Sequence, residues 1–248
     1  MLKKREIERY DRQMIIPNFG TEGQEKLKKT KVTIAGVGGL GSVVSIYLTV
    51  AGIGHLKIID DDIVEISNLN RQILHGANDI DNSKAKSAKE KLSRLNPDTE
   101  VTGVKEKITE NNVLELLKNT DAIVDCMDNF HTRYLLNEAA IKMGMPLFHG
   151  ACRGMEGQIT TIIPGKTPCL RCIFPRAPPE EKFPILGAVS GTIGTIQATE
   201  VIKFFVGMEP LLTDRLLIYD AQFLTYDQIE IKRNPKCPSC GGFNEGEG

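Results

Sequence analysis

The chain has 248 residues, of which 41% are hydrophobic and 25% are charged, and its formal net charge is −1. A nearly neutral chain gives no clear sign of a nucleic-acid partner or a membrane surface, and its apolar runs are too short to span a membrane. We therefore expect a soluble, cytoplasmic protein, whose length allows one large α/β domain or two smaller ones.

Strand and helix patterns alternate from residue 31 to residue 153. Strands are expected at 31–35, 55–59, 100–104, 121–126 and 145–151. Helices are expected at about 42–51, 83–95, 110–118 and 132–143. This βαβ alternation predicts a Rossmann-like, mainly parallel sheet with helices on both faces.

The pattern changes after residue 153. Further strands are expected at 158–163, 215–219 and 223–231, with a long helix at 188–206. Between them, residues 175–187 contain four prolines, which is typical of a mobile crossover segment. We expect a single domain over 1–248, made of an N-terminal helical segment (1–30), a nucleotide-binding half (31–153) and a sheet extension with antiparallel strands (154–248).

A glycine loop joins the first strand to the first helix of this pattern. Its glycines are Gly36, Gly38, Gly39 and Gly41. They allow the backbone to approach phosphates, and the helix N-terminus adds partial positive charge. Asp60 ends the next strand, where a carboxylate would bind ribose hydroxyls. The pattern predicts nucleotide binding without separating NAD from ATP, and a glycine turn needed only for close packing is the alternative.

A group of polar residues follows the second strand, and two of them are cations that suit a triphosphate. The group consists of Asp62, Ser67, Asn68, Arg71, Gln72 and Lys84. Arg71 and Lys84 would neutralise the β and γ groups of ATP, whereas the single pyrophosphate of a nicotinamide cofactor needs no such cluster. The alternative for each residue alone is a solvated loop position.

Asp128 and Asn129 follow the fourth expected strand. The carboxyl ends of parallel strands meet at one edge of the sheet, which is where ligands bind in this architecture. Because Mg²⁺ prefers oxygen ligands, Asp128 is the expected magnesium residue.

Four of the six cysteines form two CxxC pairs among prolines and glycines, namely Cys169 with Cys172 and Cys237 with Cys240. Four thiolates can make a closed tetrahedral site, which predicts structural Zn²⁺ that fastens the C-terminal tail to a mid-chain loop. Redox pairs, buried thiols and an iron–sulfur cluster are the alternatives. The remaining two, Cys126 and Cys152, lie in apolar runs and are expected to be buried.

Several motifs together resemble the MoeB/ThiF/HesA family of adenylyltransferases, which are related to ubiquitin-activating enzymes. The resemblance covers almost the whole chain. It is carried by Arg9-Tyr-Asp-Arg12-Gln13, the glycine loop, Asp60 to Asp62, Ser67 to Gln72, Lys84, Asp125 to Asn129, Gly154 to Gln158 and both cysteine pairs.

The resemblance implies an enzyme that uses ATP and Mg²⁺ to adenylate the C-terminal glycine of a ubiquitin-fold sulfur carrier with a Gly-Gly tail. The carboxylate attacks the α-phosphorus and pyrophosphate leaves. By similarity, Gly39 and Gly41 line the phosphates and Asp60 holds the ribose. The residues that contact phosphates or stabilise charge would be Asn68, Arg71 and Lys84, with Asp128 on Mg²⁺. Arg12 would reach the γ-phosphate of the neighbouring subunit in a homodimer.

Many relatives carry a further cysteine in the crossover segment, which forms a covalent intermediate. Residues 183–189 of this chain contain no cysteine. We therefore expect adenylation without a covalent step at that position, with the adenylate passed to a separate sulfurtransferase. Cys152 is the only alternative nucleophile, and nearby His149 is expected to be structural. Three other functions remain as alternatives. They are activation of another carboxylate (tRNA-linked or a peptide terminus), a non-catalytic nucleotide-binding partner and an NAD oxidoreductase. The pathway, whether molybdopterin, thiamine or tRNA thiolation, stays open.

Overall fold

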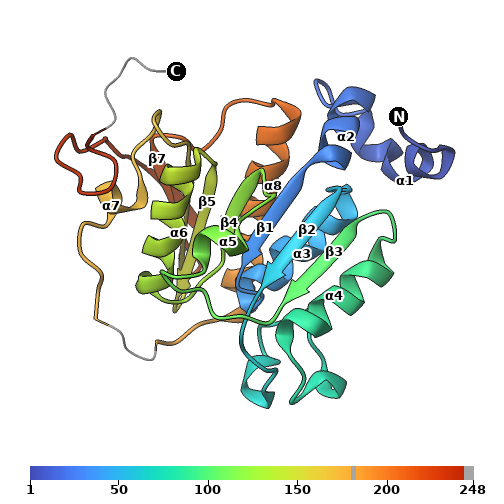
Figure 1. Ribbon diagram of the computed structural model, residues 1–248, viewed down its shortest axis with the longest axis horizontal. Helices are drawn as coiled ribbons and strands as arrows, with labels where there is room; N and C mark the ends of the chain where they lie inside the picture. The colour runs from blue at the N-terminus through green and yellow to red at the C-terminus, as the bar shows by residue number, and fades with distance from the viewer. Residues whose placement is uncertain (180–182, 243–248) are drawn as a thin grey trace.

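The computed structural model describes residues 1–179 and 183–242. Its centre is one eight-stranded sheet with the order β3-β2-β1-β4-β5-β6-β7-β8 (Figure 1). The first five strands along the chain are parallel: β1 (Lys31–Ala35), β2 (His55–Ile59), β3 (Glu100–Val104), β4 (Ala122–Asp125) and β5 (Leu147–Arg153). The last three are antiparallel to their neighbours: β6 (Glu156–Ile162), β7 (Arg215–Asp220) and β8 (Thr225–Glu230). The predicted fold class is confirmed.

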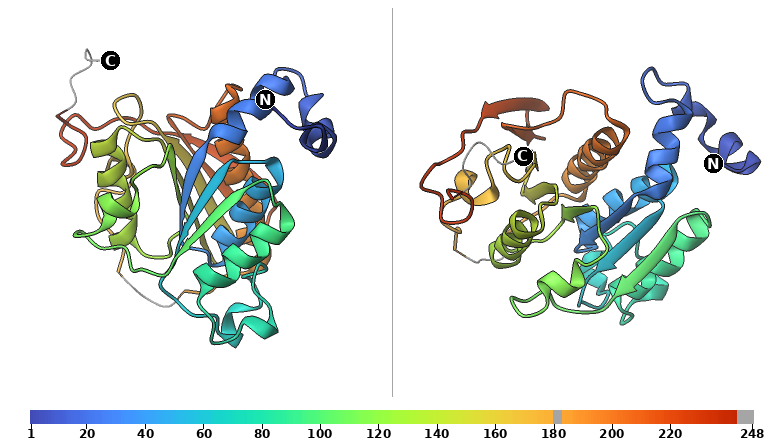
Figure 2. Two further views of the ribbon diagram at one scale, coloured as in Figure 1. Left: turned by 45° about the vertical axis from the view of Figure 1, so that its right-hand side comes forward. Right: turned by 45° about the horizontal axis from the view of Figure 1, so that its top comes forward.

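Helices cover both faces of the sheet (Figures 1 and 2). One face carries α3 (Gly39–Ala51), α4 (Lys84–Leu95) and α8 (Gly187–Val206), and the other carries α5 (Val113–Leu116), α6 (Phe130–Met143) and α7 (Leu170–Ile173). Successive strand residues point to opposite faces. Val124 and Phe148 accordingly lie in the core beneath α3 and α8, and Ile123 and Leu147 lie in the core beneath α6. Strands buried on both faces explain the continuous apolar runs of the sequence.

The N-terminal helices α1 (Lys4–Met14) and α2 (Gly20–Lys29) lie at the amino ends of the strands. Tyr10 of α1 accepts a hydrogen bond of 2.9 Å from Asn96 Nδ2, and Arg5 pairs with Asp98. Both partners come from the turn that precedes β3. The carboxyl ends of the parallel strands, where a ligand is expected, are therefore at the opposite edge of the sheet from α1.

Two expected helices differ from those observed by more than two residues at one end. α3 begins at Gly39, so the last glycines of the loop are already helical. α5 is shorter than expected, because it contains only Val113–Leu116. Lys57 Nζ donates to the carbonyl oxygens of Leu116 (2.9 Å) and Lys118 (2.8 Å), which satisfies the C-terminal end of this short helix.

Three residues of the expected crossover segment, 180–182, lie outside the described residues, as does the end of the chain from 243. None of the described helices is long and apolar enough to cross a membrane.

Candidate nucleotide site and cysteine cluster

A cavity of about 1640 Å³ lies at the carboxyl ends of the parallel strands. Its centre is the point where the chain order reverses, with β2 on one side of β1 and β4 on the other. The cavity is lined by most of the residues expected from the sequence: Gly36, Gly38, Gly39, Asp60, Asp62, Ser67, Arg71, Gln72, Lys84, Asp128 and Asn129. Strand ends that are far apart in the sequence thus contribute to one site.

The glycine loop depends on close backbone contacts. Gly36 has a φ of +86°, in the left-handed region that favours glycine. A Cβ atom added at Gly41 would lie 2.0 Å from the carbonyl oxygen of Gly36. Gly41 does not line the cavity, so its contribution is to let the loop close tightly against the start of α3.

Asp60 connects the end of β2 to the glycine loop. Its carboxylate accepts a hydrogen bond of 2.8 Å from Val37 N and one of 3.0 Å from Asp62 N. Burial raises the pKa of Asp60, while these hydrogen bonds favour its charged form. Each carboxylate oxygen keeps a second acceptor position, so Asp60 can order the loop and still accept a ligand hydroxyl.

The two expected cations are held by neighbouring groups on one wall of the cavity. Lys84 Nζ lies 2.8 Å from Asp62 Oδ2, and the lysine side chain is only 7% exposed. Arg71 Nη1 donates to Ser67 O (2.9 Å) and to Asn70 Oδ1 (3.0 Å). Both positive charges are therefore partly oriented before any anion binds.

Asn68 and Arg12 do not line this cavity. Asn68 is buried, and its Oδ1 accepts a hydrogen bond of 3.0 Å from Glu65 N, which closes the 3₁₀ turn η1 (Ile66–Asn68). Arg12 is exposed on α1, at the amino edge of the sheet. The structure brings neither residue to the cavity of its own chain.

Asp128 is an exposed carboxylate at the cavity, just before α6. Asn129 Oδ1 caps this helix by accepting a hydrogen bond of 2.9 Å from Thr132 N, and Asn129 Nδ2 lies 3.4 Å from Asp128 Oδ1. A carboxylate that faces the cavity and has acceptor positions left suits Mg²⁺.

Other cavity residues were not assigned to the site from the sequence. They include Arg133, Gln158, Phe174 and Ser190. A Cβ atom added at Gly39 would lie 3.1 Å from Ser190 Oγ, so the starts of α3 and α8 are in contact. No local pattern in the sequence indicates this contact, because it joins distant segments.

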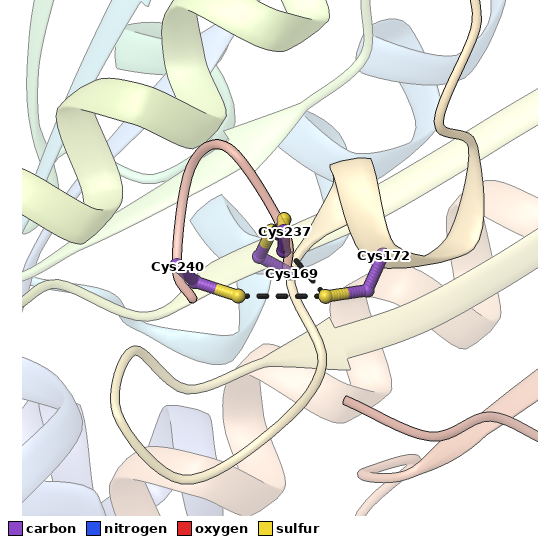
Figure 3. Close-up of side chains that lie close together, drawn as sticks. All are labelled: Cys169, Cys172, Cys237 and Cys240. Carbon is purple, nitrogen blue, oxygen red and sulfur yellow. Dashed lines mark hydrogen bonds between the residues drawn. The ribbon is translucent and has the colours of Figure 1, made fainter. Parts of the chain in front are cut away.

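The sulfur atoms of the two CxxC pairs converge on one centre (Figure 3). Sγ–Sγ distances are 3.6 Å for Cys169 and Cys237, 3.4 Å for Cys172 and Cys240, and 3.9 Å for Cys169 and Cys172. These values are too long for disulfides. Four thiolates at about 2.3 Å from one tetrahedral ion would be about 3.8 Å apart, so the geometry fits a single metal ion.

The cluster also attaches the C-terminal segment to α6. Asn137 Oδ1 accepts a hydrogen bond of 2.8 Å from Leu170 N, and Ser239 pairs with Glu138. Tyr134 Oη donates to Phe174 O at 2.8 Å, and Phe174 is part of the cavity wall. The cluster thus supports one side of the cavity without lining it.

The remaining cysteines have raised pKa values. Burial raises the pKa of Cys126 well above its usual value and that of Cys152 to about 12. His149 Nδ1 is hydrogen-bonded to Asp125 Oδ2 at 2.7 Å and is fully buried. His149 is therefore committed to a structural contact, as expected.

A glycine loop at a topological switch point, followed by cations and a carboxylate, defines an α/β nucleotide-binding protein. The model of the ThiF family matches residues 10–239, and the chain belongs to this family. The resemblance read from the motifs is confirmed.

Two relatives illustrate the match. The chain is 43% identical to the SAMP-activating enzyme E1 of Haloferax volcanii, over 95% of this chain and 89% of that protein. It is 40% identical to the sulfur carrier protein adenylyltransferase of Thermus thermophilus, over 96% and 92%. Among solved structures, E. coli MccB with MccA-N7isoASN superposes with a TM-score of 0.86 at 25% identity, over 95% of this chain and 75% of that one. The chain is an adenylyltransferase of the ThiF family.

Proposed function

We propose that this enzyme uses ATP to adenylate the C-terminal glycine carboxylate of a ubiquitin-fold sulfur carrier. The size and extent of the cavity carry the proposal. It runs from the glycine loop to Gln158 on β6 and Ile218 on β7, and its volume of about 1640 Å³ exceeds the roughly 300–1,000 Å³ of a pocket for one small ligand. A nucleotide and an extended peptide tail fit together in such a space. The names of the two relatives point to the same kind of acceptor.

The proposed reaction joins two anions, so its catalysis consists mainly of positioning and charge neutralisation. The amides at the start of α3 face the phosphates, Asp60 accepts the ribose hydroxyls, and Arg71 and Lys84 neutralise the phosphate oxygens. The carrier carboxylate forms a bond to the α-phosphorus while the bond to pyrophosphate breaks. Mg²⁺, held by Asp128, would balance the charge on the departing pyrophosphate.

Zn²⁺ is proposed as the ion of the four-cysteine cluster. A site closed by four thiolates leaves no position for water or substrate, so the ion has a structural role.

We further propose that no cysteine of this chain forms a covalent intermediate in the crossover segment. Residues 183–189 contain none, and the high pKa of Cys152 opposes a thiolate nucleophile. The adenylate would then pass to a separate sulfurtransferase. A relative whose name joins both activities, MOCS3 of Drosophila sechellia, matches this chain at 44% identity over 53% of its own length.

Arg12 is proposed to act across a homodimer. It is exposed at the sheet edge opposite its own cavity, so only a neighbouring subunit would receive its side chain.

The experiment is ATP–pyrophosphate exchange with purified ubiquitin-fold proteins that end in Gly-Gly, each compared with its tail-deleted form. Exchange that requires the intact tail supports the proposal. A peptide terminus is the second candidate acceptor, and the likeness to the structure of MccB with MccA-N7isoASN supports it. Exchange with short peptides or tRNA-linked carboxylates, but with no carrier, would replace the proposed acceptor. Nucleotide binding without any exchange would exclude all of these acceptors.

A further inference from the structure

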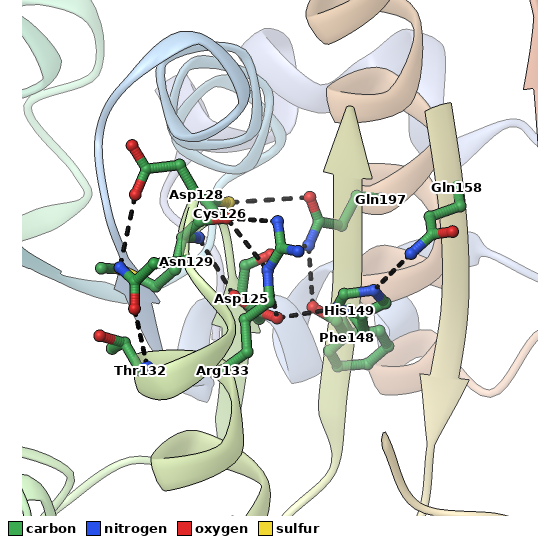
Figure 4. Close-up of polar contacts among 11 residues, drawn as sticks. Asp125, Cys126, Asp128, Asn129, Thr132, Arg133, Phe148, His149, Gln158 and Gln197 are labelled. Atoms are coloured by element: carbon green, nitrogen blue, oxygen red, sulfur yellow. Dashed lines mark hydrogen bonds and ion pairs between the residues drawn. The ribbon is translucent and has the colours of Figure 1, made fainter. Parts of the chain in front are cut away.

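A buried ionic network lies beneath the loop that carries Asp128 (Figure 4). Arg133, on the first turns of α6, has a side chain that is 7% exposed, and its Nε lies 3.8 Å from Asp125 Oδ2. Asp125 is fully buried and also receives the His149 Nδ1 hydrogen bond of 2.7 Å. A guanidinium this deeply buried needs its carboxylate partner, so the pair constrains both side chains.

The guanidinium also holds one backbone carbonyl. Arg133 Nε (3.2 Å) and Nη2 (2.6 Å) both donate to the oxygen of Met127. On the other side, Met127 N donates to Asp125 Oδ1 at 3.1 Å, and Cys126 N donates to Ala35 O at 2.9 Å. The peptide units before Asp128 are therefore fixed by side chains and by the neighbouring strand β1.

The carboxylate of Asp128 has little support of its own. It is exposed, and the contact of 3.4 Å from Asn129 Nδ2 is long for a hydrogen bond. Its position follows from the backbone, which Arg133 fixes on one side and the Asn129 cap of α6 fixes on the other.

We propose that Arg133 is a positioning residue, which holds Asp128 at the place of the divalent cation by binding the Met127 carbonyl. The inference rests on the proposed function, because it takes Asp128 as the magnesium ligand. Arginine suits the position better than lysine, since its planar fork reaches a carbonyl and a carboxylate at once, whereas an ammonium supplies only a point charge.

The test is direct cation binding by the full-length protein. Mn²⁺ is titrated by electron paramagnetic resonance in the presence of a non-hydrolysable ATP analogue, and the affinity of the analogue is measured separately without metal. For Arg133→Lys we expect at least about tenfold weaker Mn²⁺ binding, as for other groups that orient a metal ligand, and a smaller change in metal-free analogue binding. The matched control is Arg215→Lys, because Arg215 Nη2 also donates to a backbone carbonyl, Leu211 O at 2.7 Å, and does not line the cavity. This control should bind Mn²⁺ as the native protein does.

The same substitution in a protein that already lacks the Asp128 carboxylate shows whether Arg133 acts through Asp128. In Asp128→Asn protein, adding Arg133→Lys should weaken Mn²⁺ binding no further. A full additional loss would overturn the proposal, because Arg133 would then act on the ligand directly. If Arg133→Lys binds Mn²⁺ normally while Asp128→Asn does not, the positioning role is wrong and the proposed magnesium role stands. If Asp128→Asn binds Mn²⁺ normally, the magnesium role itself fails, and the positioning role fails with it.

Should Arg133→Lys fold poorly, the double variant Asp125→Asn/Arg133→Gln removes both buried charges together. It should show the same weakened Mn²⁺ binding with a cooperative thermal transition. Native Mn²⁺ affinity in this variant would contradict the proposal.

Discussion

The cavity edge of the parallel sheet and the cysteine-bound C-terminal region are stabilised in different ways. At the cavity, functional side chains are held by one another and by strands buried on both faces, as Asp60, Lys84 and Arg133 show. In the C-terminal region every residue of β8 is exposed, and the segment beyond it is joined to α7 through four sulfurs. Packing therefore stabilises the first region, whereas the second depends on the four-cysteine cluster. This predicts that a change in one region affects that region more than the other.

Loss of a cluster thiolate should give the largest effect. Cys240→Ser leaves three thiolates and an incomplete site, so we expect loss of the bound metal and a fall in the free energy of unfolding of more than about 3 kcal/mol. Metal content by mass spectrometry and urea unfolding measure the two outcomes. The control, Cys152→Ala, should keep one zinc per chain. A stable, metal-free Cys240→Ser protein would show that packing alone holds this region.

Removal of the Asp128 carboxylate should lower activity and leave stability almost unchanged. Because this side chain is exposed, Asp128→Ala should leave the unfolding free energy within about 0.5 kcal/mol of the native value. Loss of one charge-stabilising group should lower ATP–pyrophosphate exchange about 10²–10³-fold. Asp227→Ala, on the exposed strand β8, is the matched control and should retain exchange. Unchanged turnover in Asp128→Ala would rule out its metal role.

The sequence could predict the site residues that belong to local patterns, but not those brought together by packing of distant segments. Glycine spacing and polar residues that follow the strands are local patterns, and they identified eleven residues that line the cavity, from Gly36 to Asn129. The CxxC pairs carry their own signal, because their chemistry needs four thiolates at one centre. Arg133 and Ser190 carried no such signal, since their roles arise only when α6 and α8 pack beside the glycine loop. Asn68 and Gly41 show the opposite case, in which a motif residue shapes a loop and does not face the cavity.

Acid should destabilise the parallel part through two buried histidines. Burial lowers the pKa of His149, beside Asp125, and that of His75, whose Nε2 lies 3.1 Å from Val37 O. Below about pH 6.5 the unfolded chain takes up protons that the native protein does not, so stability falls as pH falls. Each group contributes a slope of at most about 1.4 kcal/mol per pH unit.

Urea unfolding between about pH 6.5 and 5.5 measures this slope in the range of an unperturbed histidine. A His149→Gln variant should show a shallower slope than the native protein. An equal slope in the two proteins would mean that His149 does not contribute. Zinc content measured at each pH separates this effect from acid release of the metal.

Cys152 lies at the boundary between the parallel and the antiparallel strands, since β5 is the last parallel strand and Cys152 pairs with Gly157 of antiparallel β6. Burial raises the pKa of Cys152 to about 12, so this thiol is a poor source of thiolate near neutral pH. Cys152→Ala should therefore change exchange by less than about threefold, which is under 1 kcal/mol. A mixture of enzyme, ATP and carrier should form no thiol-sensitive adduct on a non-reducing gel. An adduct that forms in the native protein and in Cys126→Ala, but not in Cys152→Ala, would give this boundary residue a chemical role.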